Sequence, residues 1–497
     1  MDMILEGFLA VLHPFTLLLI LAGVILGIVF GAIPGMSATM AVALCLPISF
    51  GLEPVEGISL LLGLYIGGIS GGLISAILLK IPGTPSSIAT TFDGAPLAAR
   101  GEAGKALGVG IVYSFLGGLL SFIALIFIAP PIADFSLRFG PAEYFAVTVF
   151  SLTMIAALSD GNLFKGLISG VMGLSLALVG AAPIDSFKRF TFGMYQLDLG
   201  FKILPVLIGF YAINEVFHTA AETYTLKSED AVDFKIKGFG FSAKEFVSQI
   251  KNLIISSLIG IGIGILPGIG GGTSNLLAYT AIKSTSKYPE KFGTGVIDGI
   301  VASESSNNAS IGGALIPLLT LGIPGDTVTA MLLGGLMIHG IQPGPMLFST
   351  NGAIVYSIFA ALIIGNFMML AAEFLFMRGF VRLLFIPKNI LLSIIVALCV
   401  VGAFASNNRY FDIVAMLFFG FVGYLFQKLK FPLPPFILGF ILCPTLETNL
   451  RRGMQLYQGD FTQFLNKPIA AVFLLVALGS VLVTVYRQVK KMSSAKN

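Results

Sequence analysis

The chain has 497 residues, of which 56% are hydrophobic and only 11% are charged. A soluble globular protein carries about 25% charged residues, so the composition excludes an ordinary soluble protein and indicates a polytopic membrane protein. The formal net charge is +4 without a concentrated basic block, which argues against a nucleic-acid-binding protein.

The three cysteines give no sign of a metal site. Cys45, Cys399 and Cys443 each lie inside an apolar run, and their spacing does not match that of metal ligands. We interpret them as small buried hydrophobic side chains. The first apolar run is long, follows no basic segment and continues into a Pro-Gly motif, so we expect a membrane span there and no signal peptide.

The first half of the chain is a series of apolar runs. A helix needs roughly 20 apolar residues to cross the hydrocarbon core. Residues 89–104 are rich in turn formers and charge, and we expect them to form a loop. The predicted spans cover residues 8–33, 37–50 (a short return segment), 57–81, 105–132, 142–158, 163–183 and 203–219.

Residues 222–251 form the one long polar stretch and are predicted to link an N-terminal half, 1–221, to a C-terminal half, 252–497, with extra C-terminal spans. We expect an all-α membrane protein with about 12–15 segments, including broken or re-entrant helices. The predicted segments of the second half are 252–267, 273–282 (a short return), 296–323, 327–347 (re-entrant), 351–377, 389–405, 411–426, 431–446 and 466–487.

The distribution of Lys and Arg predicts the orientation, because basic loops face the cytoplasm. Arg100, Lys283 and Arg378 fall on one side of this arrangement, together with the basic residues of the tail. We therefore expect a cytoplasmic C-terminus and an external N-terminus. Lys188, Arg189, Arg451 and Arg452 fall on the other side and do not fit.

Two short motifs occur once in each half. Residues 31–39 (GAIPGMSAT) and 264–275 (GILPGIGGGTSN) each end a long apolar run with Pro-Gly followed by small or polar residues. Residues 69–83 (ISGGLISAILLKIPG) and 311–325 (IGGALIPLLTLGIPG) form the second pair. A duplicated pair of interrupted apolar segments is the best indication of a transporter binding site that a sequence offers.

The charges around the motifs are exchanged between the halves. In the first half the loop after the first motif is acidic (Glu53, Glu56), and the loop after the second is basic (Arg100). In the second half the loop after the first motif is basic (Lys283), whereas residues 336–345 contain no Lys or Arg. This exchange predicts two repeats of inverted topology.

The breaks themselves predict the site. Proline removes a backbone donor and glycine permits a turn, so backbone groups are freed and must line protein or a wet cavity. Helix N-termini, hydroxyls and amides there suit an anion, whereas carbonyls and Asp326 suit a cation such as sodium. The predicted substrate contacts are Ser37, Thr39, Lys80, Pro82, Gly83, Thr84, Ser86, Ser87, Thr273, Ser274, Asn275, Asn307, Asn308, Pro324, Gly325 and Thr327. The predicted coupling-ion contacts are Pro34, Gly35, Pro267, Gly268 and Asp326.

Several of these residues have a simpler interpretation. The Pro-Gly pairs can be tight turns at the membrane surface, and the hydroxyls and amides can be helix caps. Lys80 can extend its amine to the cytoplasmic interface, and Asp93 suits an ordinary turn. The glycines spaced by four, from Gly23 and from Gly260, are interpreted as stripes for close helix packing.

A competing motif is G-x-S-x-G at residues 68–72, which can mark a nucleophilic serine, here Ser70. With His13, His218 or His339 as base it would indicate an intramembrane serine protease. The second repeat has Gly312 at the matching position, so the duplicated element does not require a serine. No H-E-x-x-H, Walker or nucleotide motif occurs in a suitable context, and we expect a protein that is not an enzyme and has no cofactor.

At these residues the sequence resembles the large membrane subunit of the tripartite tricarboxylate transporters. The resemblance covers nearly the whole chain and is carried by 31–54, 69–108, 264–275 and 303–345. In that family the position of Lys80 is often Asn and that of Thr84 is often acidic. This chain therefore exchanges an amide for a cation and lacks an anion near one break.

The resemblance implies a multi-pass protein of a bacterial inner membrane that takes up small carboxylates. It further implies two partners, a small four-helix membrane subunit and a periplasmic solute-binding protein that delivers the substrate. We expect coupling to sodium or a proton, because an anion alone enters against the membrane potential. The alternative is an uncoupled anion channel or uniporter.

Overall fold

The computed structural model describes residues 2–153, 163–221, 240–383, 388–405 and 407–494. They form two compact units. Each unit takes segments from both halves of the sequence, so packing divides the chain differently from the repeat, and the division at 222–251 stays a prediction. Unit 1 comprises Met1–Ala133 and Glu215–Ser406, and unit 2 comprises Asp134–Asn214 and Asn407–Asn497.

Unit 1 is helical throughout, and its helices follow the apolar runs. The early helices are α1 (Asp2–Val11), α2 (Pro14–Ala32), α3 (Ala38–Phe50), α4 (Pro54–Ser70), α5 (Gly72–Leu78), the 3₁₀ turn η1 (Pro85–Ser87), α6 (Thr90–Leu97), the π-turn η2 (Ala98–Glu102) and α7 (Ala103–Ser136). The later ones are α11 (Asn214–Ala221), α12 (Ala243–Ser248), α13 (Ile250–Ile265), α14 (Gly270–Thr285), α15 (Ile297–Leu321), α16 (Thr327–Ile338), α17 (Met346–Thr350), α18 (Gly352–Leu383) and α19 (Lys388–Ala405).

Unit 2 is helical apart from one short antiparallel strand pair, in which Gly180 lies opposite Arg189. Its interior is rich in phenylalanine, and the rings of Phe210 and Phe436 stack with centroids 4.1 Å apart. Its elements are α8 (Pro141–Thr153), α9 (Leu163–Ala177), β1 (Gly180–Ala181), β2 (Lys188–Arg189), α10 (Ile203–Leu207), the π-turn η5 (Ile208–Ile213), α20 (Tyr410–Lys428), α21 (Leu433–Leu456), α22 (Thr462–Leu465) and α23 (Pro468–Ser494).

The described residues include seven helical stretches long and apolar enough to cross a membrane, and six shorter apolar helices. This confirms the expected all-α polytopic membrane protein. The number of membrane segments stays a prediction. Helix α15 is not among the seven, because its middle is polar, although 25 residues are long enough to span.

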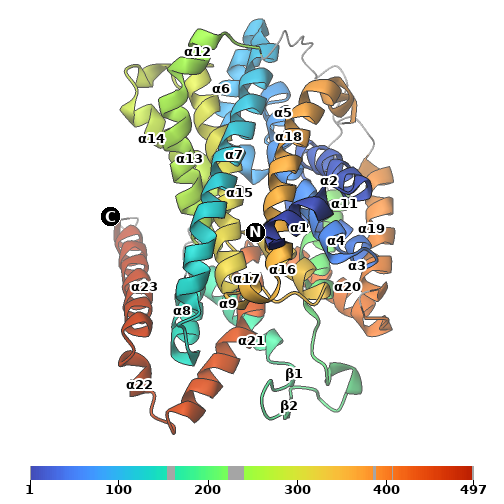
Figure 1. The fold of residues 1–497 in the computed structure, drawn as a ribbon, viewed down its shortest axis with the longest axis vertical. Coiled ribbons are helices and arrows are strands. Elements are labelled where there is room, and N and C mark those ends of the chain that lie inside the picture. Colours follow the sequence, from blue (N-terminus) through green and yellow to red (C-terminus); the bar gives the residue numbers. More distant parts are fainter. Residues whose placement is uncertain (1, 154–162, 222–239, 384–387, 406, 495–497) are drawn as a thin grey trace. The chain divides into compact units, whose positions relative to one another are not determined.

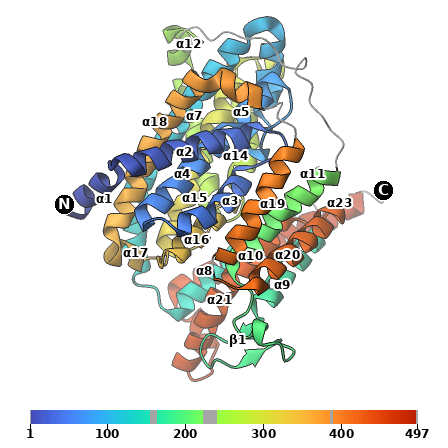
Figure 2. The ribbon, with the colours of Figure 1, turned by 90° about the vertical axis from the view of Figure 1, so that its right-hand side faces the viewer.

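Each repeat begins with two parallel helices joined by a short return helix. In the first repeat a Cβ atom on Gly23 of α2 would meet Leu60 and Leu64 of α4, and one on Gly27 would lie 2.5 Å from the Leu64 carbonyl oxygen. Later residues of α2 thus contact later residues of α4, so the two helices are parallel. They lie side by side (Figure 2). The bare glycine stripe permits this close approach.

The second repeat copies this arrangement with α13, α14 and α15. A Cβ atom on Gly260 would meet Ser306 of α15, and one on Gly264 would lie 2.6 Å from the Ser310 carbonyl oxygen. Helices α13 and α15 are thus parallel and closely packed like α2 and α4. The predicted return segments are helices α3 and α14, and both glycine stripes are packing surfaces, as expected.

The two repeats run in opposite directions. A Cβ atom on Gly57, at the start of α4, would lie 2.5 Å from His339 Nε2. At the end of α15, the Leu319 carbonyl accepts a hydrogen bond from Gly344 N at 3.2 Å. Because His339 and Gly344 belong to one short loop, α4 starts where α15 ends.

The opposite ends agree with this. Gly94 of α6 lies against Ile77 of α5, and Gly299 near the start of α15 lies against Asp93 of α6. Helix α5, which continues α4, therefore ends where α15 starts. Helices α7 and α18, which follow the second motif of each half, also run in opposite directions (Figure 1). The inverted repeat is confirmed.

Helices α4 and α15 form the buried centre of unit 1. Every residue from Gly57 to Ser70 of α4 is buried, and so is every residue from Asp298 to Thr320 of α15. The apolar sequence of α4 accounts for its burial. The polar run in α15 needs polar neighbours, which the breaks in the neighbouring helices supply.

Two local predictions were wrong. The predicted span 8–33 is two helices, because Pro14 cannot continue α1 and instead occupies the first turn of α2. The predicted loop 89–104 is largely helical, as α6 and η2. Tertiary contacts of its buried Asp93, described below, outweigh the turn-forming composition of this segment.

Candidate functional site

All four Pro-Gly motifs interrupt helices, as predicted. In each case the proline and glycine stand in the few residues between one helix and the next, where the proline lacks the N–H that a helix interior needs. The interruptions lie between α2 and α3, between α5 and η1, between α13 and α14, and between α15 and α16.

The two breaks of each repeat meet. A Cβ atom on Gly83 would collide with the Gly31 carbonyl oxygen, and one on Gly325 would lie 2.5 Å from the Gly264 carbonyl oxygen. In the second repeat Gly268 N also donates to the Gly325 carbonyl at 2.7 Å. Only glycine fits such an approach of one backbone to another.

The breaks also meet across the repeats. Thr39 Oγ1 lies 2.9 Å from Thr327 Oγ1, which joins α3 to the start of α16. The matching positions in the repeat are Gly272 and Pro85, and a Cβ atom on Gly272 would lie 3.6 Å from Pro85. Asn275 Nδ2 donates to the Ser86 carbonyl oxygen beside this contact. The four breaks therefore converge at one place, related by an approximate twofold axis.

The second break of the C-terminal repeat is closed by its own side chains. Asp326 Oδ1 accepts hydrogen bonds from Thr329 N and Thr329 Oγ1, both at 2.7 Å, and so caps α16. Tyr65 Oη of α4 donates to Asp326 Oδ2 at 2.5 Å. Both carboxylate oxygens are thus used. We call Tyr65, Asp326 and Thr329 the closed cluster.

The second break of the N-terminal repeat lacks such a bond. The repeat places Thr84 level with Asp326, and Asn307 level with Tyr65. Yet Thr84 Oγ1 and both amide atoms of Asn307 are buried with no hydrogen-bond partner among the described residues, and Asn307 is 0% exposed. The Oδ1 atom of Asn275 is unpartnered there as well. We call Thr84, Ser86, Asn275 and Asn307 the open cluster.

Three members of the open cluster, Ser86, Asn275 and Asn307, lie at the start of α14. A Cβ atom on Gly271 would lie 2.7 Å from Asn307 Oδ1 and 3.0 Å from Ser86 Oγ. Buried polar groups are normally paired, since an unpaired one loses its hydration without compensation. Amide and hydroxyl donors together with the positive end of a helix dipole would satisfy a carboxylate placed there.

Some predicted substrate residues lie outside both clusters. Lys80 is exposed and has a left-handed backbone with φ 58°, and Thr273 is exposed. Ser37 caps α3 by accepting a hydrogen bond from Met40 N at 3.2 Å. Pro82 is half-buried.

The remaining predicted residues are buried around the breaks. Ser274 Oγ donates to the Gly271 carbonyl at 3.1 Å, and Ser87 Oγ donates to the Thr84 carbonyl at 2.9 Å. Asn308 Nδ2 donates to the Glu304 carbonyl. Pro324 is buried as well, like Gly83 and Gly325. Of the predicted coupling-ion residues, Pro34, Pro267, Gly268 and Asp326 are buried and Gly35 is exposed.

Sequence reasoning gave no role to Tyr65, Glu304 or Glu373. Glu304 is fully buried on α15 and accepts hydrogen bonds from Thr90 Oγ1 and Ser114 Oγ. Glu373 is fully buried on α18. A signal was present for Glu373, since a lone acid inside a predicted span is a functional candidate by default. Tyr65 carried no such signal.

Ser70, the nucleophile of the protease alternative, is fully buried and lies against Glu373. His339 lies at the other end of α4, against Gly57, and His13 precedes the start of α2. The described contacts therefore pair Ser70 with a carboxyl group and not with an imidazole base.

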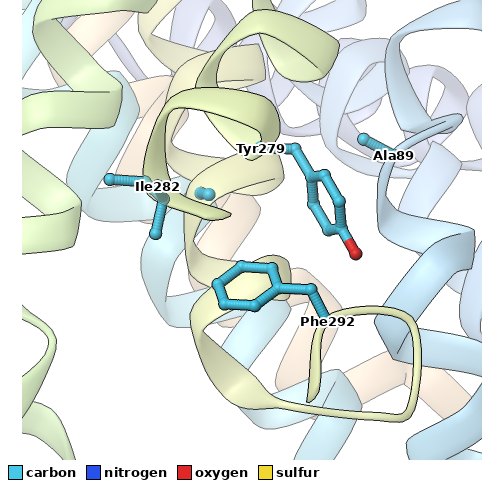
Figure 3. Close-up of a cluster of buried hydrophobic side chains, with 5 residues drawn as sticks. Ala89, Tyr279, Ile282 and Phe292 are labelled. Carbon is cyan, nitrogen blue, oxygen red and sulfur yellow. The ribbon is translucent and has the colours of Figure 1, made fainter. Parts of the chain in front are cut away.

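Asp93 holds the loop before α15 in place. Its Oδ1 atom accepts hydrogen bonds from Gly293 N, Gly295 N and Val296 N at 2.8–3.0 Å. Its Oδ2 atom accepts one from Tyr279 Oη at 2.8 Å. Tyr279 belongs to a buried cluster with Ala89, Ile282, Phe292 and Ala302 (Figure 3). Asp93 thus has a structural role between the repeats that exceeds an ordinary turn.

Comparison with known proteins gives a consistent result. Residues 17–438 match the model of the "Tripartite tricarboxylate transporter TctA family". An uncharacterized 52.8 kDa protein in the TAR-I ttuC' 3' region of Agrobacterium vitis is 35% identical over 485 residues, which cover 97% of this chain and 96% of that protein. An uncharacterized protein in the TAR-II ttuC' 3' region of the same organism is 36% identical over 228 residues, 46% of this chain and 94% of that protein. No solved structure matches significantly.

Proposed function

Because the chain belongs to the tripartite tricarboxylate transporter TctA family, we propose that it is the large membrane subunit of a secondary transporter for small carboxylates. The substrate class extends to di- and monocarboxylates as well as tricarboxylates. The site is the open cluster at the convergence of the four breaks. Its location between two inverted repeats is the usual one for secondary transporters.

The observation that carries the proposal is the unpaired side chain of Asn307. It is fully buried, and its amide lies beside Ser86 and the first turn of α14. In this arrangement a substrate carboxylate accepts hydrogen bonds from the Asn307 amide and the Thr84 hydroxyl while it faces the N-terminus of α14. The closed cluster offers no equivalent unpaired groups, since Tyr65 and Thr329 already donate to both oxygens of Asp326.

The proposed transport is coupled to a cation. Each negative charge that enters the cell against a potential of 100 mV costs about 2.3 kcal/mol. Sodium or a proton that enters with the anion offsets this cost. The family is described as tripartite, which supports two partners for this chain, a small membrane subunit and a periplasmic solute-binding protein. The proposed location is a bacterial inner membrane, with the C-terminus in the cytoplasm.

Uptake by proteoliposomes tests the proposal. The vesicles contain this chain with its small membrane partner, and radiolabelled mono-, di- and tricarboxylates are supplied under a sodium or proton gradient, with and without the binding protein. Concentrative uptake that requires the binding protein and one gradient is the expected result. Flux that only equilibrates and needs no binding protein would identify an uncoupled channel instead. Folded protein without flux of any carboxylate would contradict the proposal.

A further inference from the structure

Two buried carboxyl groups in unit 1 are not part of the open cluster. Glu304 lies on α15 and Glu373 on α18, and both residues are 0% exposed. None of the ion pairs among the described residues involves either of them. A buried carboxylate without a cation is costly to keep ionised, and inside a membrane protein such groups mark ion or proton pathways.

The two groups differ in their surroundings. Both oxygens of Glu304 accept hydroxyl hydrogen bonds, one from Thr90 and one from Ser114, the latter at 2.8 Å. Neither oxygen of Glu373 has a hydrogen bond of normal geometry among the described residues. The buried hydroxyl of Ser70 lies beside Glu373, and its oxygen also has no bond of normal geometry among the described residues.

Glu304 and α18 contact neighbouring residues of α7, because Ser114 Oγ donates to Glu304 and the Phe115 carbonyl accepts a hydrogen bond from Asn366 Nδ2 of α18. Two like charges in a low-dielectric interior disfavour simultaneous ionisation, so the pair titrates as a unit. Of the two, Glu304 has the donors that stabilise a carboxylate. Glu373 is the group that gains most from a bound proton.

Within the described part of the chain, the charged side chains on the helices packed against α18 do not take over this role. Helices α2 and α17, which pack on α18, contain no titratable residue, and Glu6 of α1 is exposed near the far end of α18. On α4, Tyr65 is bound to Asp326, and Glu56 lies in the first turn.

Helix α7 also packs on α18, through the bond from Asn366 Nδ2 to the Phe115 carbonyl. Its Lys105 pairs with Glu245 at 2.5 Å, and its Tyr113 Oη donates to the Phe246 carbonyl. On α18 itself, Arg378 and Arg382 follow Glu373 toward the end of the helix, and Tyr356 lies near its start. Among the described residues, Glu304 is therefore the charged group that we assign as the partner of Glu373.

We propose that Glu373 binds and releases the coupling proton, with Glu304 as the partner that sets its affinity. This inference rests on the proposed function as a coupled carboxylate transporter. A proton is favoured over a metal ion by the donor set, since hard cations take six or more oxygen ligands and one hydroxyl lies beside Glu373. The described residues contain no group of three His, Cys, Asp or Glu side chains that could hold a metal ion.

Helix α15 connects this carboxyl pair to the open cluster. Asn308 Nδ2 donates to the Glu304 carbonyl oxygen at 3.2 Å, and Asn307 is the residue directly before Asn308. Glu304 and Asn307 are three residues apart, about 4.5 Å along the helix axis. A shift of α15 on substrate binding would therefore move Glu304 relative to Glu373, and this displacement couples the two sites.

Infrared difference spectroscopy of the purified chain in lipid tests the proton site without a substrate. A neutral carboxylic acid has a C=O stretching band that a carboxylate lacks and that shifts in deuterated water. We expect such a band near neutral pH, absent in Glu373→Gln and retained in Glu373→Asp. Glu143→Gln is the matched control, because Glu143 is a buried acid of unit 2 that caps α8 through Gly140 N.

The control variant should keep the band, and Glu304→Gln should change the pH at which it titrates. A band that persists unchanged in Glu373→Gln, or that disappears on addition of sodium at constant pH, would overturn the inference. Circular dichroism and thermal unfolding of each variant show whether it is folded. If Glu373→Gln does not fold, the band in Glu373→Asp tests the proton site instead.

Uptake separates this inference from the proposed function. In proteoliposomes, Glu373→Gln should retain exchange of carboxylate across the membrane but lose concentration driven by a proton gradient, by at least 10-fold. Proton-driven concentration at the wild-type level in Glu373→Gln would refute the proton site and leave the transporter intact. Absence of carboxylate flux in the folded wild-type chain would instead refute the proposed function, while the infrared result still decides the proton site.

Discussion

The second breaks of the two repeats follow a similar backbone path. They differ in the hydrogen-bond partners of their polar groups. At the second break of the C-terminal repeat, both oxygens of Asp326 accept hydrogen bonds, one from Tyr65 of α4 and the other from Thr329. At the second break of the N-terminal repeat, the matching residues are Thr84 and, from α15 of the other repeat, Asn307, and both have buried atoms without a partner among the described residues. The two copies of one scaffold therefore differ: the protein pairs the polar groups of one break and leaves those of the other unpaired among the described residues.

The two repeats also differ three residues before the glycine of each of these breaks. Gly322 has φ 73° and ends α15 in the left-handed conformation that glycine adopts readily. Lys80 occupies the matching place with φ 58°, a conformation that is strained for a side chain with a Cβ atom. At this position the N-terminal repeat thus holds a strained residue where the C-terminal repeat holds glycine. Strained backbone of this kind is often found at functional sites.

Removal of the Asp326 carboxylate should have the largest effect on the comparison. Asp326→Ala removes the cap of α16 and leaves Tyr65 Oη unpaired in the interior, so we expect a loss of about 2–4 kcal/mol in the free energy of unfolding. Thermal unfolding in detergent measures it. Thr84→Ala is the matched change in the open cluster and should lose less than 1 kcal/mol, because its Oγ1 atom makes no hydrogen bond. Equal losses would mean that the clusters do not differ.

Truncation of Asn307 should have the next largest effect, on uptake and not on folding. Asn307→Ala removes amide hydrogen bonds to a charged substrate, each worth about 1.5–3 kcal/mol, so the ratio kcat/KM for uptake should fall about 10- to 100-fold. Tyr65→Phe is the control, because Tyr65 is the residue of the closed cluster that the repeat matches to Asn307, and the change removes its hydroxyl group. If Tyr65→Phe lowered uptake as much as Asn307→Ala, the assignment of the substrate to the open cluster would fail.

A methyl group placed in the open cluster should have a smaller effect. In Gly271→Ala the new Cβ atom lies 2.7 Å from Asn307 Oδ1, so it fills part of the space for the carboxylate. We expect KM to rise several-fold. Gly272→Ala places its Cβ atom 3.6 Å from Pro85, an ordinary contact, and should leave KM unchanged. A similar KM in both variants would show that substrate does not approach the start of α14.

Lys80→Gly should have the smallest effect. It copies the residue of the closed repeat and removes left-handed strain, which should raise the free energy of unfolding by up to about 1 kcal/mol. Because Lys80 is exposed, uptake should not change. A fall in uptake would instead support the sequence-based prediction that Lys80 contacts the substrate.

The breaks and the repeat could be predicted from the sequence because they depend on local chemistry. Proline at 34, 82, 267 and 324 lacks the backbone donor of a helix interior, and the glycine that follows each of them permits the turn, so the Pro-Gly pair disfavours a continuous helix. The same applies to the glycine stripes, whose four-residue spacing lies on one helix face. The exchange of charges around the motifs correctly predicted the inverted topology.

What depends on distant contacts could not be predicted. The difference between the clusters requires Tyr65 to meet Asp326, which is 261 residues away in the sequence. The sequence predicted a loop at residues 89–104 because the hydrogen bonds that Asp93 accepts from Gly293 N, Gly295 N and Val296 N are invisible in the local sequence. The pairing of Glu304 with Thr90 and Ser114 has the same origin.

The central claim is that substrate binds in the open cluster, and substrate-induced thermal stabilisation tests it most directly. A ligand that binds only the folded protein raises its unfolding temperature by an amount that grows with the logarithm of its concentration above Kd. The purified wild-type chain, Tyr65→Phe and Asn307→Ala are each heated with acetate, succinate or citrate. We predict that one of these carboxylates stabilises the wild-type chain and Tyr65→Phe equally but has no effect on Asn307→Ala at the same concentration. Equal stabilisation of Asn307→Ala, or its loss in Tyr65→Phe alone, would contradict the account.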